Sequence, residues 1–222
     1  MTLRRPLSVP DEARSGLTQL AGLDDALTDL LFAAIHRQSP RLLHAPFIEA
    51  IHDAVPDRLK PTSGSILQAL ISVSLGREES ELSGEDFAWG VANSTDLEIP
   101  RPQREGLEVA LLRALREPSL VVTAKAWDIQ TENQANFGDA RIVTEMRPIF
   151  VDVADSPVSA LIVHELRVTY GNKQEASEFH IALDEVDVIR LIETLNRAQA
   201  KAQRLRETLK RIELSVLERE RG

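Results

Sequence analysis

The spacing of apolar residues along the chain changes near residue 118. Before that point, apolar residues recur every three or four positions in short runs interrupted by proline, glycine or serine, a pattern typical of amphipathic helices. The runs cover residues 24–38, 40–55, 63–76, 83–94 and 101–117. We expect Ser63 or Ser65 to cap the third helix and Gly76 to end it. Short helices with shared apolar stripes predict a helical bundle over residues 1–118.

After residue 118 the apolar period shortens to two, which indicates strands. Apolar and polar residues alternate over residues 160–170 and again over residues 179–183, and the segment GNKQEA between them has the composition of a turn. The two segments predict a β-hairpin. Residues 139–153 predict a further strand, in which Pro148 favours an edge position or a bulge. Residues 119–133 predict a fourth strand, although the alanines and the lysine there also suit a helix.

A long amphipathic helix is expected after the strands. Asp184 is positioned to cap it, with Asp187 three residues later approximating a capping box. From residue 188 to residue 216 apolar residues recur at alternating steps of three and four, without proline or glycine. This heptad seam consists of Val188, Leu191, Leu195, Ala198, Ala202, Leu205, Leu209, Ile212 and Val216. Such a repeat predicts a helix that packs along its length against another element.

The chain is therefore predicted to be an α+β protein with two domains, a helical bundle over residues 1–118 and an antiparallel sheet with the long helix over residues 119–222. This layout resembles that of the COMM-domain proteins. The resemblance covers about residues 119–209 and rests on Trp127 in the first expected strand, on the hairpin, and on the passage from strand to helix at residues 183–199. It implies a domain that pairs with a second copy by interlocking sheet and helix, as a scaffold without catalysis. Trp127 and the seam residues are the expected interface.

Charge and cysteine content narrow the functional classes. The 222 residues include 35 acidic and 26 basic side chains, and the net charge of -9 argues against a surface built as a whole for nucleic acid or anionic membranes. The absence of cysteine excludes disulfides and thiolate metal sites. No apolar run approaches the roughly 20 residues that span a bilayer. The first residues carry two arginines without a following hydrophobic stretch, so we expect no export signal and a cytoplasmic location.

No motif for a reaction or a cofactor is found. Phosphate-binding glycine loops and the G-x-S-x-G elbow are absent, so we expect no catalytic residue, no cofactor and no metal. The strongest candidate for a metal site is the segment EFHIALDEVD, in which Glu178 and His180 share a strand face and Asp184 and Asp187 begin the helix. A solvent-facing strand and a helix cap explain the same residues.

The histidines offer no clearer metal site. His36, His44 and His52 recur every eight residues, but prolines interrupt the segment, so they do not share one helical face. His164 falls on the apolar face of its strand, where we expect a hydrogen-bonded core histidine.

The seam extends beyond what a small sheet can cover, which favours a second chain as its partner. We therefore expect a non-enzymatic, self-associating adaptor or assembly subunit, a dimer or larger, whose N-terminal bundle binds another protein. One alternative is an enzyme or small-ligand protein with a pocket between bundle and sheet, lined by His164 or by the carboxylates of residues 178–187. Another is a nucleic-acid accessory factor, although no aromatic residue accompanies the basic face of the long helix. That face is formed by Arg190, Arg197, Lys201, Arg204, Arg206, Lys210 and Arg211.

Overall fold

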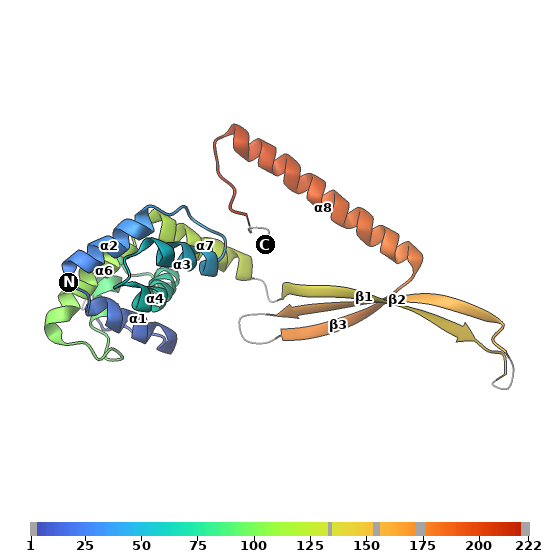
Figure 1. Ribbon diagram of the computed structural model, residues 1–222, viewed down its shortest axis with the longest axis horizontal. Helices are drawn as coiled ribbons and strands as arrows, with labels where there is room; N and C mark the ends of the chain where they lie inside the picture. The colour runs from blue at the N-terminus through green and yellow to red at the C-terminus, as the bar shows by residue number, and fades with distance from the viewer. Residues whose placement is uncertain (1–3, 133–134, 153–155, 172–175, 219–222) are drawn as a thin grey trace. The chain divides into compact units, whose positions relative to one another are not determined.

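The computed structural model describes residues 4–132, 135–152, 156–171 and 176–218 and divides into two compact units (Figure 1). The first unit is helical and extends to Gln130, and the second runs from Thr131 to Val216. The predicted α+β class is confirmed, with a helical N-terminal part, an antiparallel sheet and a long helix near the C-terminus.

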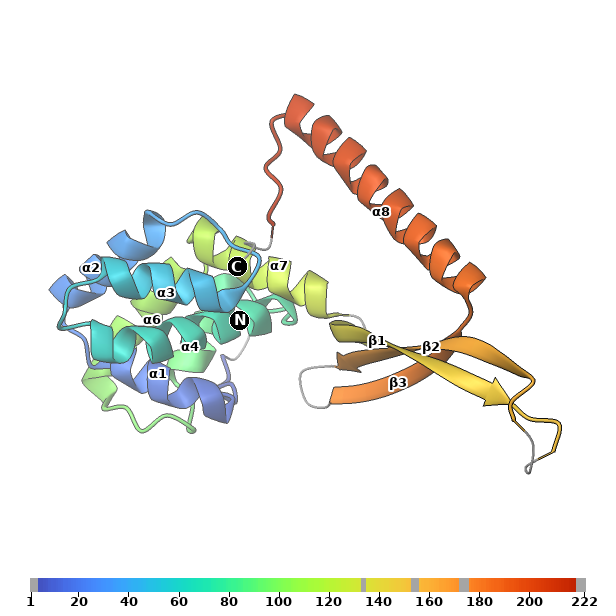
Figure 2. The same cartoon turned by 45° about the vertical axis from the view of Figure 1, so that its right-hand side comes forward.

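Seven helices form the helical unit among the described residues (Figure 2). They are α1 (Asp11–Ala21), α2 (Asp25–His36), α3 (His44–Ala54), α4 (Lys60–Glu78), α5 (Gly84–Ala92), α6 (Arg101–Ala114) and α7 (Pro118–Thr131). The five runs recognised in the sequence correspond to α2 through α6. Asp24 and Ser83 cap α2 and α5, each accepting a hydrogen bond from the backbone N–H three residues later.

Helix α4 lies at the centre of this unit because it carries apolar residues on several sides. Ile66, Leu67 and Leu70 are fully buried, and α4 packs against α1, α3 and α6. The backbones of α1 and α4 approach so closely at Gly16 that a Cβ there would collide with the backbone of Ser65.

The expected ends of α4 are wrong. The helix begins at Lys60, where Pro61 fits the first turn, and it continues through Gly76 to Glu78. Ser63 is not the cap. It is buried, and its hydroxyl donates to the Lys60 carbonyl oxygen.

Helix α7 replaces the expected fourth strand. Pro118 occupies the first helical position, where its missing N–H costs nothing, and so begins a helix instead of ending one. Leu120, Thr123 and Ala124 have helical spacing and are buried in the core of the helical unit. The β-branched run around them favoured a strand, but tertiary packing overrides that local preference. The boundary between the units therefore lies after Gln130 and not after residue 118.

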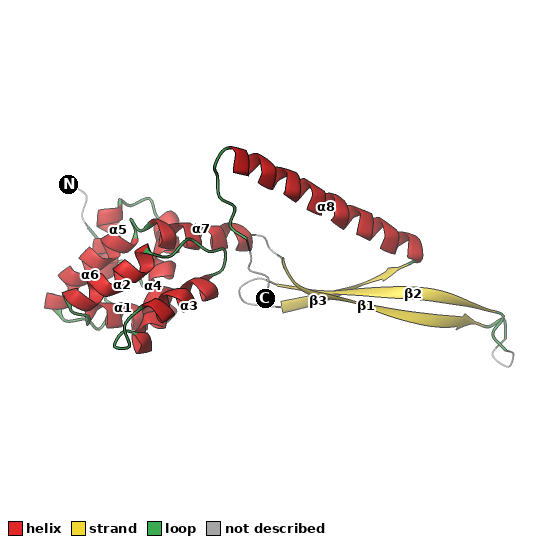
Figure 3. Ribbon diagram, turned by 45° about the horizontal axis from the view of Figure 1, so that its top comes forward, coloured by secondary structure: helices red, strands yellow, loops and turns green. Residues whose placement is uncertain are grey.

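The second unit contains a three-stranded antiparallel sheet in the order β1-β2-β3 (Figure 3). The strands are β1 (Asn136–Ile149), β2 (Ser159–Gly171) and β3 (Ala176–Leu183). The predicted hairpin is confirmed as β2 and β3, and β1 is an edge strand that contains Pro148. The central residues of the expected turn, 172–175, lie outside the described residues. Strand β3 ends at Leu183, opposite His164 of β2. Residues 159–163 of β2 therefore pair only with β1, and the two strands form a two-stranded ribbon there.

Helix α8 (Glu185–Arg211) follows β3 directly. Asp184 and Asp187 form the predicted capping box, with each side chain accepting from the other's backbone N–H. The helix is shorter than expected at its C-terminal end. Ile212 is the C-cap residue, and Glu213 has a φ of 57°, which ends the helix. Ile212 and Val216, the last two residues of the predicted seam, therefore lie outside it.

Candidate self-association surface

One face of the sheet is apolar along all three strands. The antiparallel register pairs Ile142 with Leu166 and Met146 with Ile162, and across the other side of β2 it pairs Leu166 with Ile181. Successive side chains on a strand alternate between faces, so these partners share one face. The same face carries Phe137, Ala140, Val168, Tyr170, Phe179 and Leu183. The rings of Tyr170 and Phe179 pack with their centroids 5.6 Å apart.

This face is open in the single chain. Met146 is 71% exposed, Ile162 61% and Ile142 51%. At the end of the β1–β2 ribbon, Phe150 and Val158 are exposed as well. A well-packed sheet buries such a face against another layer, whereas here the apolar side chains of β1 on this face are exposed.

Burial differs sharply between the two units. Of the 24 large apolar side chains that are exposed among the described residues, 20 belong to residues 131–216. Of the 32 buried apolar residues, only Leu183 belongs to that segment. The second unit thus has almost no core of its own, whereas the helical unit has a complete one.

Helix α8 presents the predicted seam, and it is also open. None of its residues is buried; Leu195 is 64% exposed and Leu205 63%. Val188, Ala202 and Leu209 are half-buried. The seam is therefore available to another element, which is what the heptad pattern requires. Its described helical members are Val188, Leu191, Leu195, Ala198, Ala202, Leu205 and Leu209.

Sequence reasoning missed part of this surface. The expected interface includes no residue of the sheet, although Ile142, Met146 and Phe179 are as open as the seam. The signal was present in the period-two alternation. The alternation predicts a sheet face that packs against the protein's own long helix. In the structure, however, no residue of α8 is buried.

The opposite face of the sheet is polar and held by ion pairs. Arg167 donates to Glu165, and the two ring nitrogens of His180 lie 3.2 Å from Glu165 Oε1 and 3.6 Å from Glu178 Oε2. The hydrogen bonds from Arg167 and His180 hold the pKa of the Glu165 carboxyl below its ordinary value. Arg141 lies 4.0 Å from Glu178. This face is satisfied by its own partners in water, unlike the apolar one.

The structure does not assemble the candidate metal site. Both nitrogens of His180 face glutamates on the sheet, while Asp184 and Asp187 accept backbone hydrogen bonds in the capping box. Within the described segments, no three His, Asp or Glu side chains are placed to share a metal ion.

The other histidines have separate partners. His164 lies on the apolar sheet face, half-buried, with Nδ1 2.8 Å from Thr144 Oγ1, so it is hydrogen-bonded but not in a core. His36 pairs with Glu117 at 3.3 Å, and His52 Nδ1 lies 3.0 Å from the hydroxyl of Ser63.

Trp127 lies on α7 and not on a strand. Its ring packs against the imidazole of His44 with the centroids 4.9 Å apart, within the helical unit. The expectation that it belongs to the first strand is wrong, and the structure gives it a structural role between α3 and α7.

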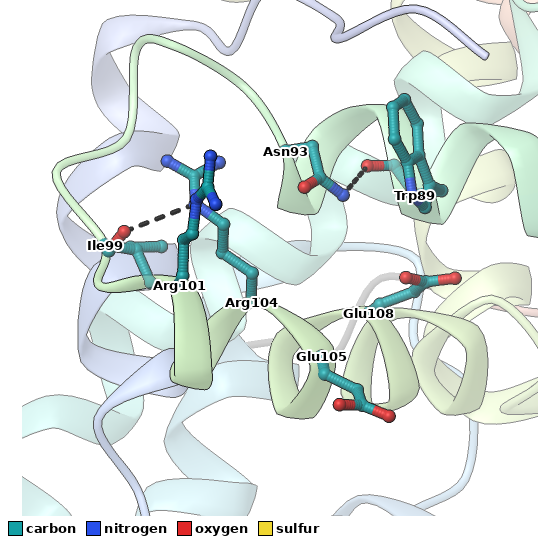
Figure 4. A pocket seen from close by; sticks show the side chains of 7 residues that line it. All are labelled: Trp89, Asn93, Ile99, Arg101, Arg104, Glu105 and Glu108. Carbon is teal, nitrogen blue, oxygen red and sulfur yellow. Dashed lines mark hydrogen bonds between the residues drawn. The ribbon is translucent and has the colours of Figure 1, made fainter. Parts of the chain in front are cut away.

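One pocket lies beside α5 and α6 in the helical unit (Figure 4). Its volume is about 570 Å³, and Trp89, Asn93 and Arg104 line it together with Ile99, Arg101, Glu105 and Glu108. Arg104 directs its guanidinium at four carbonyl oxygens, those of Ala92, Ser94, Leu97 and Ile99, at 3.1 to 3.3 Å. These contacts use four of the five N–H donors of the guanidinium, so Arg104 binds the backbone and not a ligand.

Comparison with known proteins adds no assignment: no protein-family model matches the chain, and no relative is found among curated proteins. In the part of the chain that the structure describes, no helix is long and apolar enough to cross a membrane.

Proposed function

We propose that the protein is a non-enzymatic adaptor or assembly subunit that associates with itself through residues 131–216. The observation that carries this proposal is the exposure of the apolar sheet face and the α8 seam in the same unit. Leaving large apolar side chains in water forfeits on the order of 1.5 to 3 kcal/mol for each. With 20 such side chains exposed, the unit needs a partner to be stable.

A second copy of the chain is the simplest partner because it supplies both surfaces at once. The seam of one copy covers the apolar sheet face of the other, and symmetry makes the exchange reciprocal. The resemblance to COMM-domain proteins supports this arrangement, since a small antiparallel sheet followed by an amphipathic helix is the order that it implies. The helical position of Trp127 departs from the resemblance, so the proposal does not use that residue.

The helical unit gives the adaptor its second surface. Its core is complete, so it has no need of a partner in order to fold. Pairing through residues 131–216 therefore leaves the helical unit free to bind another protein and brings two copies of it into one assembly.

The test compares substitutions on the two faces of each element in the full chain. Leu205→Asp places a charge in the seam, while Gln203→Asp places the same charge on another face of α8. Ile142→Asp places a charge on the apolar face of β1, and Val143→Asp places the same charge on its opposite face. Sedimentation velocity should show that Leu205→Asp and Ile142→Asp dissociate or aggregate while the two controls sediment like wild type.

Leu205, Gln203 and Ile142 are exposed in the single chain and Val143 is half-buried, so a monomer would tolerate the charges at Leu205 and Ile142 at least as well as the charge at Val143. Equal sedimentation of Leu205→Asp and Gln203→Asp, both folded, would contradict the proposal.

A further inference from the structure

Helix α8 carries a second ordered feature, about 100° around the helix from the nearer line of seam residues. Arg190, Arg197, Arg204 and Arg211 follow one another at intervals of seven residues, and all four are exposed. Seven residues rise about 10.5 Å and turn nearly twice around the helix, so the four arginines form one line along its length. Lys201, four residues after Arg197, lies beside the line. We call these five residues the basic stripe.

The stripe is poorly neutralised by its own helix. From residue 197 to residue 211 the sequence has six basic side chains and a single acidic one, Glu207. Arg190 lies 4.0 Å from Asp187, at the limit of an ion pair. Arg197 donates to the hydroxyl of Thr194, and Arg211 donates to the carbonyl oxygen of Glu207, so neither contact supplies a negative charge.

We propose that the basic stripe is a docking surface for an acidic α-helix of a partner protein. The seven-residue interval favours a helix as the partner. A second helix that runs alongside α8 faces it with the same side every seven residues. Glutamates at that interval would meet the arginines one by one, in the way that flanking charges specify partners in coiled coils. The proposal goes beyond self-association, because the stripe lies about 100° around α8 from the nearer line of seam residues and the helix can use both surfaces at once.

Nucleic acid and anionic membranes fit the stripe less well. A nucleic-acid surface places phosphates much more closely than one per 10 Å, and the stripe has no aromatic side chain for base stacking. A helix that lies in a membrane buries its apolar side there, whereas in the proposed assembly the seam of α8 is covered by a second copy of the chain.

The test uses the full chain and a synthetic four-heptad helical peptide with one glutamate per heptad in a single line. A peptide of the same composition with the glutamates scrambled is the comparison. We expect the ordered peptide to bind about tenfold more tightly than the scrambled one, the factor that four modest surface ion pairs supply together, and to weaken with salt. Calorimetry or fluorescence anisotropy measures both affinities.

The matched variants each remove two positive charges from the same helix. Arg197→Gln/Arg204→Gln lies on the stripe and should abolish the preference for the ordered peptide, while Arg206→Gln/Lys210→Gln lies off it and should preserve the preference. Equal binding of both peptides, no binding of either, equal loss in the two variants, or tighter binding to duplex DNA or to phosphatidylserine vesicles would overturn the proposal. Light scattering on the same samples reports self-association separately, so failure of the stripe is distinguishable from failure of the proposed function.

Discussion

Single side chains fix local geometry in both units, and Arg104 is the clearest case in the helical one. Its guanidinium holds the carbonyl oxygens of residues 92–99, where the chain passes from α5 to α6. A lysine keeps the charge but lacks the planar fork that reaches several carbonyls together. This connection therefore depends on one residue type.

We expect Arg104→Lys to destabilise that connection by about 2 kcal/mol, since hydrogen bonds from a charged donor are lost. Hydrogen exchange measured by mass spectrometry should show faster exchange of residues 92–104 and little change elsewhere. Arg101→Lys, on the same helix and lining the same pocket, is the control. Unchanged exchange in Arg104→Lys would mean that the connection is held by other contacts.

On the sheet, Glu165 should confer a pH dependence. Its pKa is lowered in the folded chain, so its contribution to stability is present above the ordinary value of 4.5 and is lost as the pH falls through the folded value. A carbon-detected NMR titration should find the Glu165 carboxyl titrating below 4.5, with smaller amide protection factors in β2 and β3 at lower pH. Arg167→Gln should raise this pKa, while Arg141→Gln should leave it nearly unchanged. A Glu165 pKa at or above 4.5 would refute the assigned contacts.

At the scale of elements, the sequence predicted what local patterns encode. Strict period-two alternation identified β2 and β3, and the capping residues Asp184 and Asp187 located the start of α8. Helix α7 was mistaken for a strand because Val121 and Val122 favour strands locally, while its burial depends on packing against distant helices. The seam was predicted as helical through Val216, but α8 ends at Arg211, because apolar spacing alone does not reveal where a helix ends.

The helical assignment of α7 predicts where its substitutions act. Leu120 is fully buried in the helical core and Ile129 is 65% exposed, so Leu120→Ala should cost about 2 to 5 kcal/mol and Ile129→Ala much less. Urea unfolding followed by tryptophan fluorescence measures this selectively, because both tryptophans of the chain, Trp89 and Trp127, lie in the helical unit. Equal, small losses in both variants would mean that α7 is not part of that core.

At the scale of the whole molecule, the two units differ in how far they bury their apolar side chains. The helical unit buries its apolar residues within one chain, and the unit from Thr131 to Val216 exposes them on a sheet face and a helix seam. In the proposed function, the helical unit binds another protein and the segment from Thr131 to Val216 is completed by a second copy of the chain. The sequence predicted the α8 seam as an interface but not the sheet face, because an alternating pattern shows which residues are buried together but not in which chain their cover lies.

The mass of the wild-type chain in solution tests this account most directly. Multi-angle light scattering should give at least twice the chain mass of 24.7 kDa at tens of micromolar, and the larger species should persist at high salt because apolar burial holds it together. A single species of 24.7 kDa that remains folded and soluble over that range would contradict the account, since it would leave the apolar sheet face and the α8 seam open to water in the working protein.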